Sequence, residues 1–277
     1  GRTIKCVPTI HPAATFRQPS LERACVVDWE RIAAELQFRE LRRPVRTHHI
    51  YPSLSQLAAL HQSACEPGAV LAIDIENPRS SKTAPVYEED GVTPAIYKSG
   101  KRKGHKKTKK VSGEPKIVCI GFALSATESI TVPTDLSYWK SEARWKEAWS
   151  WIRHLCTSPA EKVLHNGLYD TFFLADHGIR LANWKWDTLY MHHCLDASAP
   201  HDLAYCASVD TREPYWKDQA KDPDTAGRYT SNWASFLEYN GKDCCVTREL
   251  FDTYKSRLTS LSLHDETGLD FYLRHYT

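Results

Sequence analysis

The sequence has neither a C-x-x-C pair nor an apolar run that approaches the ~18 residues of a membrane span. Its nine cysteines are odd in number, and Cys244 and Cys245 are adjacent, a spacing that rarely allows a disulfide. This usage favours reduced thiols in an intracellular, cytoplasmic protein. Residues 1–15 are polar and contain Pro8 and Pro12, so they do not have the pattern of a signal peptide. We therefore expect neither a membrane partner nor a secreted disulfide framework.

No recognised zinc-ligand spacing is present either. Zinc sites place cysteine and histidine ligands at characteristic short intervals. The residues that could be combined into such a site lack these intervals; they are His192, His193, Cys194, His201 and Cys206. We therefore expect no zinc. The 42% hydrophobic and 11% aromatic fractions are those of a folded globular protein.

Positive charge is concentrated in one segment. The formal net charge is +2, but residues 98–110 carry eight Lys and Arg and no acid, so the rest of the chain stands at −6. The surrounding Asn77–Pro115 is rich in Pro, Gly, Ser and Lys without an apolar period, which predicts a mobile loop or insertion. It is either a solvated loop or a non-specific DNA arm that contacts phosphates. Such an arm would use Lys101, Arg102, Lys103, Lys106 and Lys107.

The hydrophobic pattern predicts an α/β domain in which helices cover a sheet. Strands are expected at 69–76, 117–124, 129–133 and 162–166, the second and third forming a hairpin. Helices are expected at 27–41, 53–61, 138–156, 168–177, 188–195 and 232–261. Ser53 and Asp187 are expected to cap two of them, Gly178 to stop a third, and Gly241 is a candidate interruption of the last.

Four acids stand out by their position in these elements. Asp74 and Glu76 lie two apart at the end of the first strand, so both side chains leave the same face. Asp170 follows another strand, and Asp243 lies in the last helix. Clustered carboxylates repel one another unless a cation lies among them. Oxygen ligands without histidine or cysteine favour Mg²⁺ or Mn²⁺, and two such ions can stabilise both oxygens of a phosphodiester displacement.

The sequences around these acids resemble the three exonuclease motifs of the DEDD superfamily. The motifs stand here as D-I-E (74–76), H-N-G-L-Y-D (165–170) and Y-N-G-K-D (239–243). One branch of the superfamily has Tyr four residues before the last Asp and the other has His five before it. Because these positions hold Tyr239 and Glu238, the chain resembles the tyrosine branch.

Three further stretches resemble the proofreading domain of bacterial and phage DNA polymerase I, a family A polymerase. They are W-D-T-L-Y-M-H-H-C-L-D (186–196), D-L-A-Y-C-A (202–207) and E-P-Y-W-K-D (213–218). The resemblance covers roughly 69–261 and implies an α/β fold with a ribonuclease H-like mixed β-sheet flanked by helices. The first two motifs are further apart than is usual in the family, because 77–115 is inserted between them.

The resemblance also implies roles for individual residues. Asp74, Glu76, Asp170 and Asp243 would hold two Mg²⁺ ions, which Mn²⁺ can replace, with Asp74 bridging them. Tyr239 would orient the attacking water, and Asn166 would contact the substrate near its 3′ end. A histidine base is not required because the metal itself acidifies water. We therefore read His165 as structural, and the remaining nearby acids as caps and surface acids; these are Asp187, Asp196, Asp202 and Asp210.

The function implied is a two-metal-ion 3′→5′ exonuclease. It would hydrolyse DNA, preferably at single-stranded 3′ ends, to nucleoside monophosphates, with a role in proofreading, DNA repair or DNA replication. Its partners would be DNA and a polymerase or glycosylase domain in cis or in trans. Two alternatives stay open: an RNA-trimming exonuclease similar to ribonuclease D, and a non-catalytic nucleic-acid-binding module.

The amino-terminal segment has a separate resemblance. V-P-T-I-H-P-A-A-T-F-R (7–17), followed by V-V-D-W-E-R from Val26, resembles the closing part of family 4-type uracil-DNA glycosylases. The water-activating and uracil-pocket motifs of that family are absent, so no base-flipping pocket can be assembled and glycosylase activity is not expected. We predict a segment 1–67, an exonuclease domain 68–265 with the basic insertion 77–115, and a tail 266–277.

Overall fold

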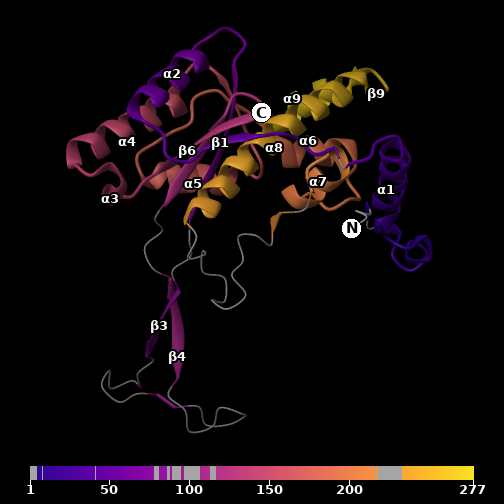
Figure 1. Cartoon of the computed structure of the whole chain (residues 1–277), viewed down its shortest axis with the longest axis horizontal. Helices are drawn as coiled ribbons and strands as arrows, with labels where there is room; N and C mark the ends of the chain where they lie inside the picture. The colour runs from indigo at the N-terminus through magenta and orange to yellow at the C-terminus, as the bar shows by residue number, and fades with distance from the viewer. Residues whose placement is uncertain are drawn as a thin grey trace.

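The structure is a computed structural model, shown in Figure 1. It describes residues 5–7, 9–40, 42–77, 81–85, 88, 95–96, 107–112, 117–214, 216–217 and 233–277. All nine cysteines are unpaired, as the sequence predicted. Within the described residues, no helix has the length and apolar character needed to cross a membrane.

The centre of the molecule is a six-stranded mixed sheet in the order β1-β6-β5-β2-β7-β8. Strand β5 runs antiparallel to β6 and β2, whereas the other neighbours are parallel. The predicted mixed sheet flanked by helices is confirmed. The strands are β1 (Thr47–His49), β2 (Val70–Glu76), β5 (Cys119–Ala123), β6 (Glu128–Pro133), β7 (Glu161–Leu164) and β8 (Trp184–Asp187).

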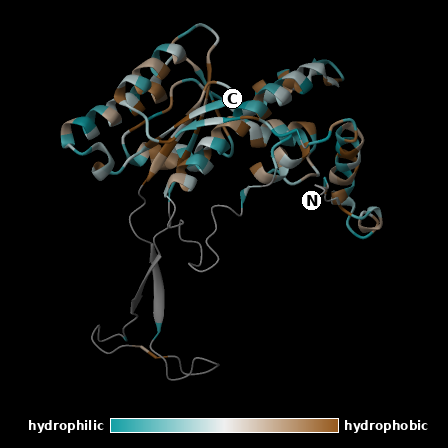
Figure 2. Cartoon of the chain, in the orientation of Figure 1, coloured by the Kyte–Doolittle hydropathy of each residue, from teal (hydrophilic) through white to brown (hydrophobic). Residues whose placement is uncertain are grey.

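Helices cover both faces of this sheet (Figure 1). One face packs on α2 (Leu54–Ala64), α3 (Leu136–Trp139), α4 (Glu142–Thr157) and α5 (Leu168–Asp176). The other packs on α6 (Thr188–Leu195), α7 (Leu203–Asp210), α8 (Trp233–Ser260) and α9 (Gly268–Tyr276). Figure 2 shows hydrophobic residues gathered where the helices face the strands.

Strand β2 contributes to both cores because its side chains alternate between the two faces. Ile73 and Ile75 pack with the α4 side, and Ala72 packs with the α8 side. Asp74 and Glu76 continue the Ala72 face, so the alternation directs both acids toward α8. The buried strand thus positions the first motif without any special backbone conformation.

Helix α8 runs without a break past Gly241, so the expected interruption at this residue is wrong. The glycine instead allows α8 to approach the sheet closely. A Cβ added there would lie 2.6 Å from Ser129 Oγ and 3.1 Å from Thr131 Oγ1. This close approach brings the carboxyl group of Asp243 on α8 to the end of β2.

Three other sequence expectations need correction. The amino-terminal helix α1 is Glu22–Glu35 rather than 27–41. The helix expected at 138–156 is divided into α3 and α4, since Lys140 adopts φ +60° and Ser141 caps a new helix. The insertion 77–115 contains an antiparallel ladder of β3 (Ser81–Pro85) and β4 (Thr108–Ser112), separate from the main sheet.

Residues 47–64 pack as part of the sheet layer. Strand β1 pairs with β6, α2 packs against α4, and the Ser53 capping box starts α2 as predicted. The Arg46 guanidinium is ion-paired with Glu213 at 2.8 Å and with Glu249 at 2.5 Å. At the other end, β9 (Ser262–Leu263) and β10 (Glu266–Thr267) lead into α9. The division into 1–67, 68–265 and 266–277 stays a prediction.

Candidate metal-binding active site

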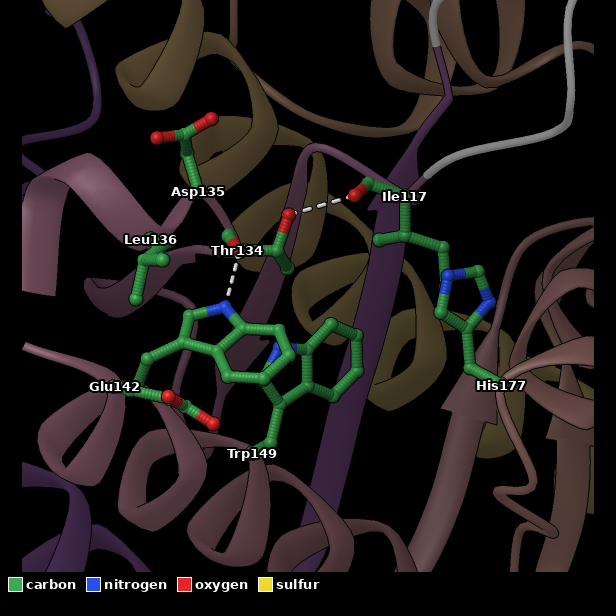
Figure 3. A pocket seen from close by; sticks show the side chains of 8 residues that line it. Ile117, Thr134, Asp135, Leu136, Glu142, Trp149 and His177 are labelled. Carbon is green, nitrogen blue, oxygen red and sulfur yellow. Dashed lines mark hydrogen bonds between the residues drawn. The ribbon is translucent and has the colours of Figure 1, made fainter.

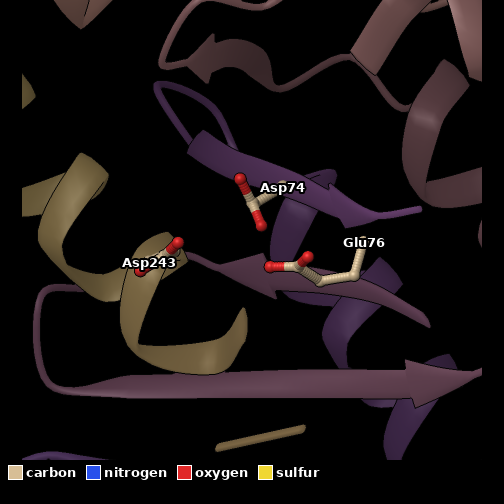
Figure 4. Close-up of side chains that lie close together, drawn as sticks. All are labelled: Asp74, Glu76 and Asp243. Atoms are coloured by element: carbon tan, nitrogen blue, oxygen red, sulfur yellow. The ribbon is translucent and has the colours of Figure 1, made fainter. Parts of the chain in front are cut away.

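Three carboxyl groups meet between the end of β2 and the middle of α8. One oxygen each of Asp74, Glu76 and Asp243 lies within 4.8 Å of the others, and Figure 4 shows these side chains turned toward one another. Asp243 is buried, and the two β2 acids are half-buried. Asp74 and Asp243 are 169 positions apart in sequence, so the packing of α8 against β2 brings them together. The predicted convergence is therefore present for these three acids.

Asp170 lies in the first turn of α5, outside this trio but in the same cavity. Its Oδ1 accepts a hydrogen bond from the backbone N–H of Ile75 at 3.0 Å, which joins the second motif directly to β2. The cavity has a volume of about 440 Å³, and its lining includes Asp74, Asn166, Asp170, Lys217 and Asp243. All three predicted motifs thus contribute to one hollow.

The electrostatic state of this hollow favours uptake of a cation. Burial and the charges of Asp243, Asp170 and Glu76 raise the pKa of Asp74 well above its usual range. Burial raises the pKa of Asp170 to about 7, although the hydrogen bond from Ile75 opposes the shift. Carboxyls that are costly to ionise together become favourable ligands once a divalent ion offsets their charge.

Lys217 and Trp216 are site residues to which the sequence analysis gave no role. The Trp216 Nε1–H donates to Asp243 Oδ1 at 2.8 Å, and the Lys217 ammonium donates to Asp243 Oδ2 at 2.5 Å. Both oxygens of Asp243 are therefore engaged. The charges of Asp243, Asp74 and Glu76 raise the pKa of Lys217, although burial opposes this shift. The available signal was their place in the polymerase-like stretch 213–218.

Tyr239 lies next to this cluster, where its hydroxyl accepts a hydrogen bond from Lys217 Nζ at 2.8 Å. Burial, followed by the charge of Asp243, raises the pKa of Tyr239. The side chain is therefore a neutral phenol, which can orient a polar group but cannot serve as a phenolate base.

Asn240 is a third site residue that could not be assigned from the sequence. It is fully buried, and its Nδ2 donates to Asp74 Oδ2 at 2.7 Å. A side chain at Gly121 of β5 would overlap the Asn240 carboxamide, so the glycine makes the necessary space. Asn240 follows Tyr239 directly in the third motif, which was the only signal for it.

The turn after β7 presents the second motif. Asn166 adopts φ +60°, a left-handed conformation that asparagine tolerates better than most residues. The backbone N–H groups of Asn166 and Gly167 donate to the buried Asp187 carboxylate at 3.0 and 2.8 Å. Asp187 also caps α6, as expected. One buried acid thus fixes the turn that carries Asn166 to the cavity.

His165 lines the cavity, and its Nδ1 lies 2.8 Å from Thr188 Oγ1. Burial lowers the pKa of His165 to about 3, so the ring is neutral at physiological pH. A neutral ring held against α6 agrees with the structural reading from the sequence.

Asp210 is not a surface acid, which corrects the sequence reading. Its buried carboxylate is ion-paired with Arg23 of α1 at 3.0 Å and with Arg257 of α8 at 2.8 Å. Asp202 caps α7, while Asp196 accepts from Ser198 N and pairs with Arg23. Asp196 and Asp210 therefore tie α1 to the neighbouring helices, whereas Asp202 also lines the cavity of the carboxylate cluster.

Two other groups of residues were candidates from the sequence: those considered for zinc and the cations of the proposed DNA arm. Over the part of the chain that the structure describes, the carboxylate trio is the only group of His, Cys, Asp or Glu with metal-ligand spacing, so the residues considered for zinc form no such group. Lys107 donates its backbone N–H to Ala95 O at 2.6 Å. The other cations of the proposed DNA arm lie outside the described residues; they are Lys101, Arg102, Lys103 and Lys106.

Comparison with known proteins does not assign the chain to a family. No family model matches it, and neither does any curated protein. Among solved structures, it is similar to the catalytic core of RRP6 from Trypanosoma brucei, with 15% identity over 91% of this chain and 57% of that one and a TM-score of 0.46. The chain therefore spans little more than half the length of that catalytic core.

Two further solved structures are similar at the same level. Escherichia coli RNase D, an exoribonuclease involved in structured RNA processing, shares 16% identity over 76% of this chain and 46% of its own, with a TM-score of 0.45. The POL domain of Pol1 from M. smegmatis, in complex with DNA primer-template and dNTP, shares 11% identity over 77% and 28%, with a TM-score of 0.46.

Proposed function

We propose that this chain is a divalent-metal-dependent 3′→5′ exonuclease acting on single-stranded ends of DNA. The observation that carries the proposal is the meeting of Asp74, Glu76 and Asp243 within 4.8 Å, with Asp170 in the same cavity. Three separate chain segments contribute these acids. A fold gains no stability from gathering buried carboxyls in this way unless a cation compensates them.

The donor set fits two Mg²⁺ or Mn²⁺ ions. It consists of carboxylate oxygens, the ligands these hard cations prefer. Asp74, Glu76, Asp170 and Asp243 would hold the ions, with Asp74 central because it faces both α8 and the Asp170 side of the cavity. When bound, such ions supply charge stabilisation for the attacking and leaving oxygens of a phosphodiester.

The protein's own groups would do the positioning. Asn166 and Tyr169 line the cavity beside Asp170, where they can contact the terminal nucleotide. The neutral Tyr239 hydroxyl can orient a water molecule toward the phosphate. Lys217, which is ion-paired with Asp243, would turn its ammonium toward the substrate phosphate if a divalent ion took the Asp243 carboxylate as a ligand.

DNA is preferred over RNA because the stretches within 186–218 resemble a polymerase proofreading domain. On that basis we propose a role in proofreading, repair or replication in the cytoplasm, with a polymerase or glycosylase domain as a partner in cis or in trans. The basic segment 98–110 would act as a non-specific DNA arm, so its deletion should weaken DNA binding and flatten the salt dependence of that binding.

The test is digestion of 5′- and 3′-labelled oligonucleotides of matched DNA and RNA sequence with Mg²⁺, Mn²⁺ or chelator. Wild type should shorten 5′-labelled DNA stepwise, release the 3′ label as a mononucleotide, and be inactive with chelator. Asp74→Ala and Asp243→Ala should lose this activity. Asp252→Ala is the matched control, since Asp252 lies on α8 with a side chain 60% exposed and, among the described residues, is ion-paired with Arg248 alone.

Each competing reading gives a different result in this assay. Faster digestion of RNA than of DNA would replace the proposed substrate with RNA. A wild-type protein that binds both polymers and digests neither would be a non-catalytic binding module. Undiminished digestion by both alanine variants would refute the assignment of the site.

A further inference from the structure

A second hollow lies on the opposite face of the sheet from the carboxylate cluster. It has a volume of about 410 Å³ and is bounded by the start of β5, the link from β6 to α3, α4 and the end of α5 (Figure 3). Its lining includes Ile117, Thr134, Glu142, Trp145, Trp149 and His177. An adjoining hollow of about 350 Å³ shares the three aromatic rings and adds Lys146 and Arg153.

The aromatic rings of this hollow are held in place. The Trp145 Nε1–H donates to Thr134 O at 2.8 Å, and Thr134 Oγ1 donates to Ile117 O at 2.6 Å. Trp149 stacks on His177 with ring centroids 5.6 Å apart and an interplanar angle of 9°. Trp145 meets Trp149 edge-on at 6.3 Å. The walls are therefore preformed, as small-molecule and nucleotide sites commonly are.

Polar groups of both kinds accompany these rings. Trp149 is 8% exposed, and its Nε1–H has no hydrogen-bond partner among the described residues. Glu142 pairs with Lys146 at 2.6 Å at the rim, and Arg153 lies one helical turn beyond Trp149 on α4. Aromatic faces, a buried donor and two cations suit a ligand that is aromatic, has acceptor atoms and carries a phosphate.

Helix α5 connects this hollow with the carboxylate cavity. Asp170 lies in the first turn of α5 and His177 is its C-cap, a separation of about 10 Å at ~1.5 Å per residue. Tyr169, which lines the carboxylate cavity, contacts Phe173 with ring centroids 4.7 Å apart. Phe173 contacts Phe172 at 5.3 Å, and the His177 Nδ1–H donates to Phe173 O at 2.9 Å.

The exposed face of this helix is unusually aromatic. Phe172 is 67% exposed and Tyr169 is 37% exposed. Neither of these two side chains covers the core, because Leu174 and the partly buried Phe173 pack against the core from α5. Helix α5 therefore presents the exposed rings of Tyr169 and Phe172 between the carboxylate cavity and the hollow, whereas the core and Trp149 partly cover Phe173 and His177.

We propose that the hollow at Trp145, Trp149 and His177 binds a nucleobase of the substrate strand upstream of its 3′ end, with Phe172 supporting the strand in between. The inference rests on the proposed function and deepens it by naming a second substrate subsite. Base stacking on aromatic side chains is tolerant of sequence, as a general exonuclease requires. Lys146 and Arg153 would contact the phosphates of that nucleotide and its neighbour.

The subsite makes binding depend on strand length. About 10 Å corresponds to roughly three nucleotides at ~3.4 Å per stacked nucleotide. A dinucleotide with its 3′ end among the carboxylates cannot reach the hollow, whereas an octanucleotide can. A variant of this subsite should therefore weaken binding of the octanucleotide and leave binding of the dinucleotide unchanged. General electrostatic attraction would instead change gradually with the number of phosphates.

The experiment measures fluorescence anisotropy of 5′-labelled di- and octathymidylate in the presence of chelator. The variants are Phe172→Ala, Trp145→Ala and Arg153→Ala, with Trp29→Ala as control, since Trp29 is 51% exposed on α1 away from both hollows. The first and third variants change exposed side chains, so the test does not depend on whether Trp145→Ala folds.

We expect the octanucleotide to lose at least about fivefold in affinity with Phe172→Ala and with Trp145→Ala, and the dinucleotide to be unchanged. Wild-type-like octanucleotide binding by Phe172→Ala and Arg153→Ala would overturn the proposal, as would equal losses for both lengths. These results do not depend on hydrolysis. A wild-type protein inactive in the Mg²⁺ digestion assay would refute the exonuclease while leaving the binding result to decide the subsite.

Discussion

Replacing Lys217 by methionine separates the two states of the site, with and without metal. In the structure, the Lys217 ammonium is 2.5 Å from Asp243 Oδ2 and 2.8 Å from the Tyr239 hydroxyl. The side chains of Lys217 and Asp243 are only 20% and 5% exposed. Removing one partner of a buried ion pair costs about 3–5 kcal/mol, because the other charge stays buried alone.

In chelator, we expect the variant to lose about 3 kcal/mol of unfolding free energy. The loss is at the low end of that range because carboxyl groups with a raised pKa, such as Asp74, can take up a proton and reduce the cost. For a chain of this size, that corresponds to a fall of roughly 6–10 °C in Tm. The control is Lys185→Met, whose partner Glu161 is 35% exposed, and it should change stability by less than about 1 kcal/mol.

The same variant should bind metal more tightly than wild type. A divalent ion that takes Asp243 as ligand has to displace Lys217, and the variant removes this competitor. We expect the Kd for Mn²⁺ to fall at least about tenfold, equivalent to ~1.4 kcal/mol, by isothermal titration calorimetry. Unchanged metal-free stability together with unchanged or weaker Mn²⁺ binding would refute this account of Lys217.

Three further predictions follow from the same contacts. The pKa of Asp170 is raised to about 7 from an unfolded value near 3.8, so its protonated form contributes stability that is fully present below pH 3.8 and is lost as the pH rises through 7. Urea unfolding in chelator should show this loss of stability. Over the range from pH 5 to 7, Mn²⁺ affinity should rise by about tenfold per pH unit. Tyr239→Phe should lower the single-turnover rate by roughly 10- to 100-fold while leaving the oligonucleotide Kd unchanged, whereas an unchanged rate would remove the hydroxyl from the mechanism. Gly241→Ala should lower the free energy of unfolding by about 1–3 kcal/mol in urea, because its methyl would press on Ser129 and Thr131, and a neutral effect would show that α8 can move away from the sheet.

Much of this site could be predicted from sequence because local patterns specify it. Alternation along β2 separates Ile73 and Ile75 from Asp74 and Glu76, and the pattern is visible in seven consecutive residues. The caps at Ser53 and Asp187 are equally local, since each side chain bonds to backbone within three residues. The α/β class followed from the order of such segments.

The misses share a physical reason, which is that they depend on contacts between distant segments. Strand β1 is only three residues long, and its pairing with β6 joins positions about 80 residues apart. Asp210 reads as a surface acid until Arg23 and Arg257 are brought to it by α1 and α8. Gly241 reads as a helix breaker because only the packed sheet shows why a side chain is excluded there.

Lys217 shows the same limit within the site itself. Its chemistry comes from Asp243, 26 positions along the chain, and from a hydroxyl that α8 presents beside it. No spacing rule connects a lysine after Trp216 with an acid in the following helix. Only the resemblance of 213–218 to a polymerase domain directed attention to this stretch.

The most direct test of the account is anomalous diffraction from crystals of this protein soaked in Mn²⁺. We predict manganese peaks at coordination distance from Asp74, Glu76 and Asp243, with Asp170 reaching the second ion and the Lys217 ammonium displaced from Asp243. Crystals that diffract well but show no manganese among these carboxylates, with Lys217 still bonded to Asp243, would contradict it.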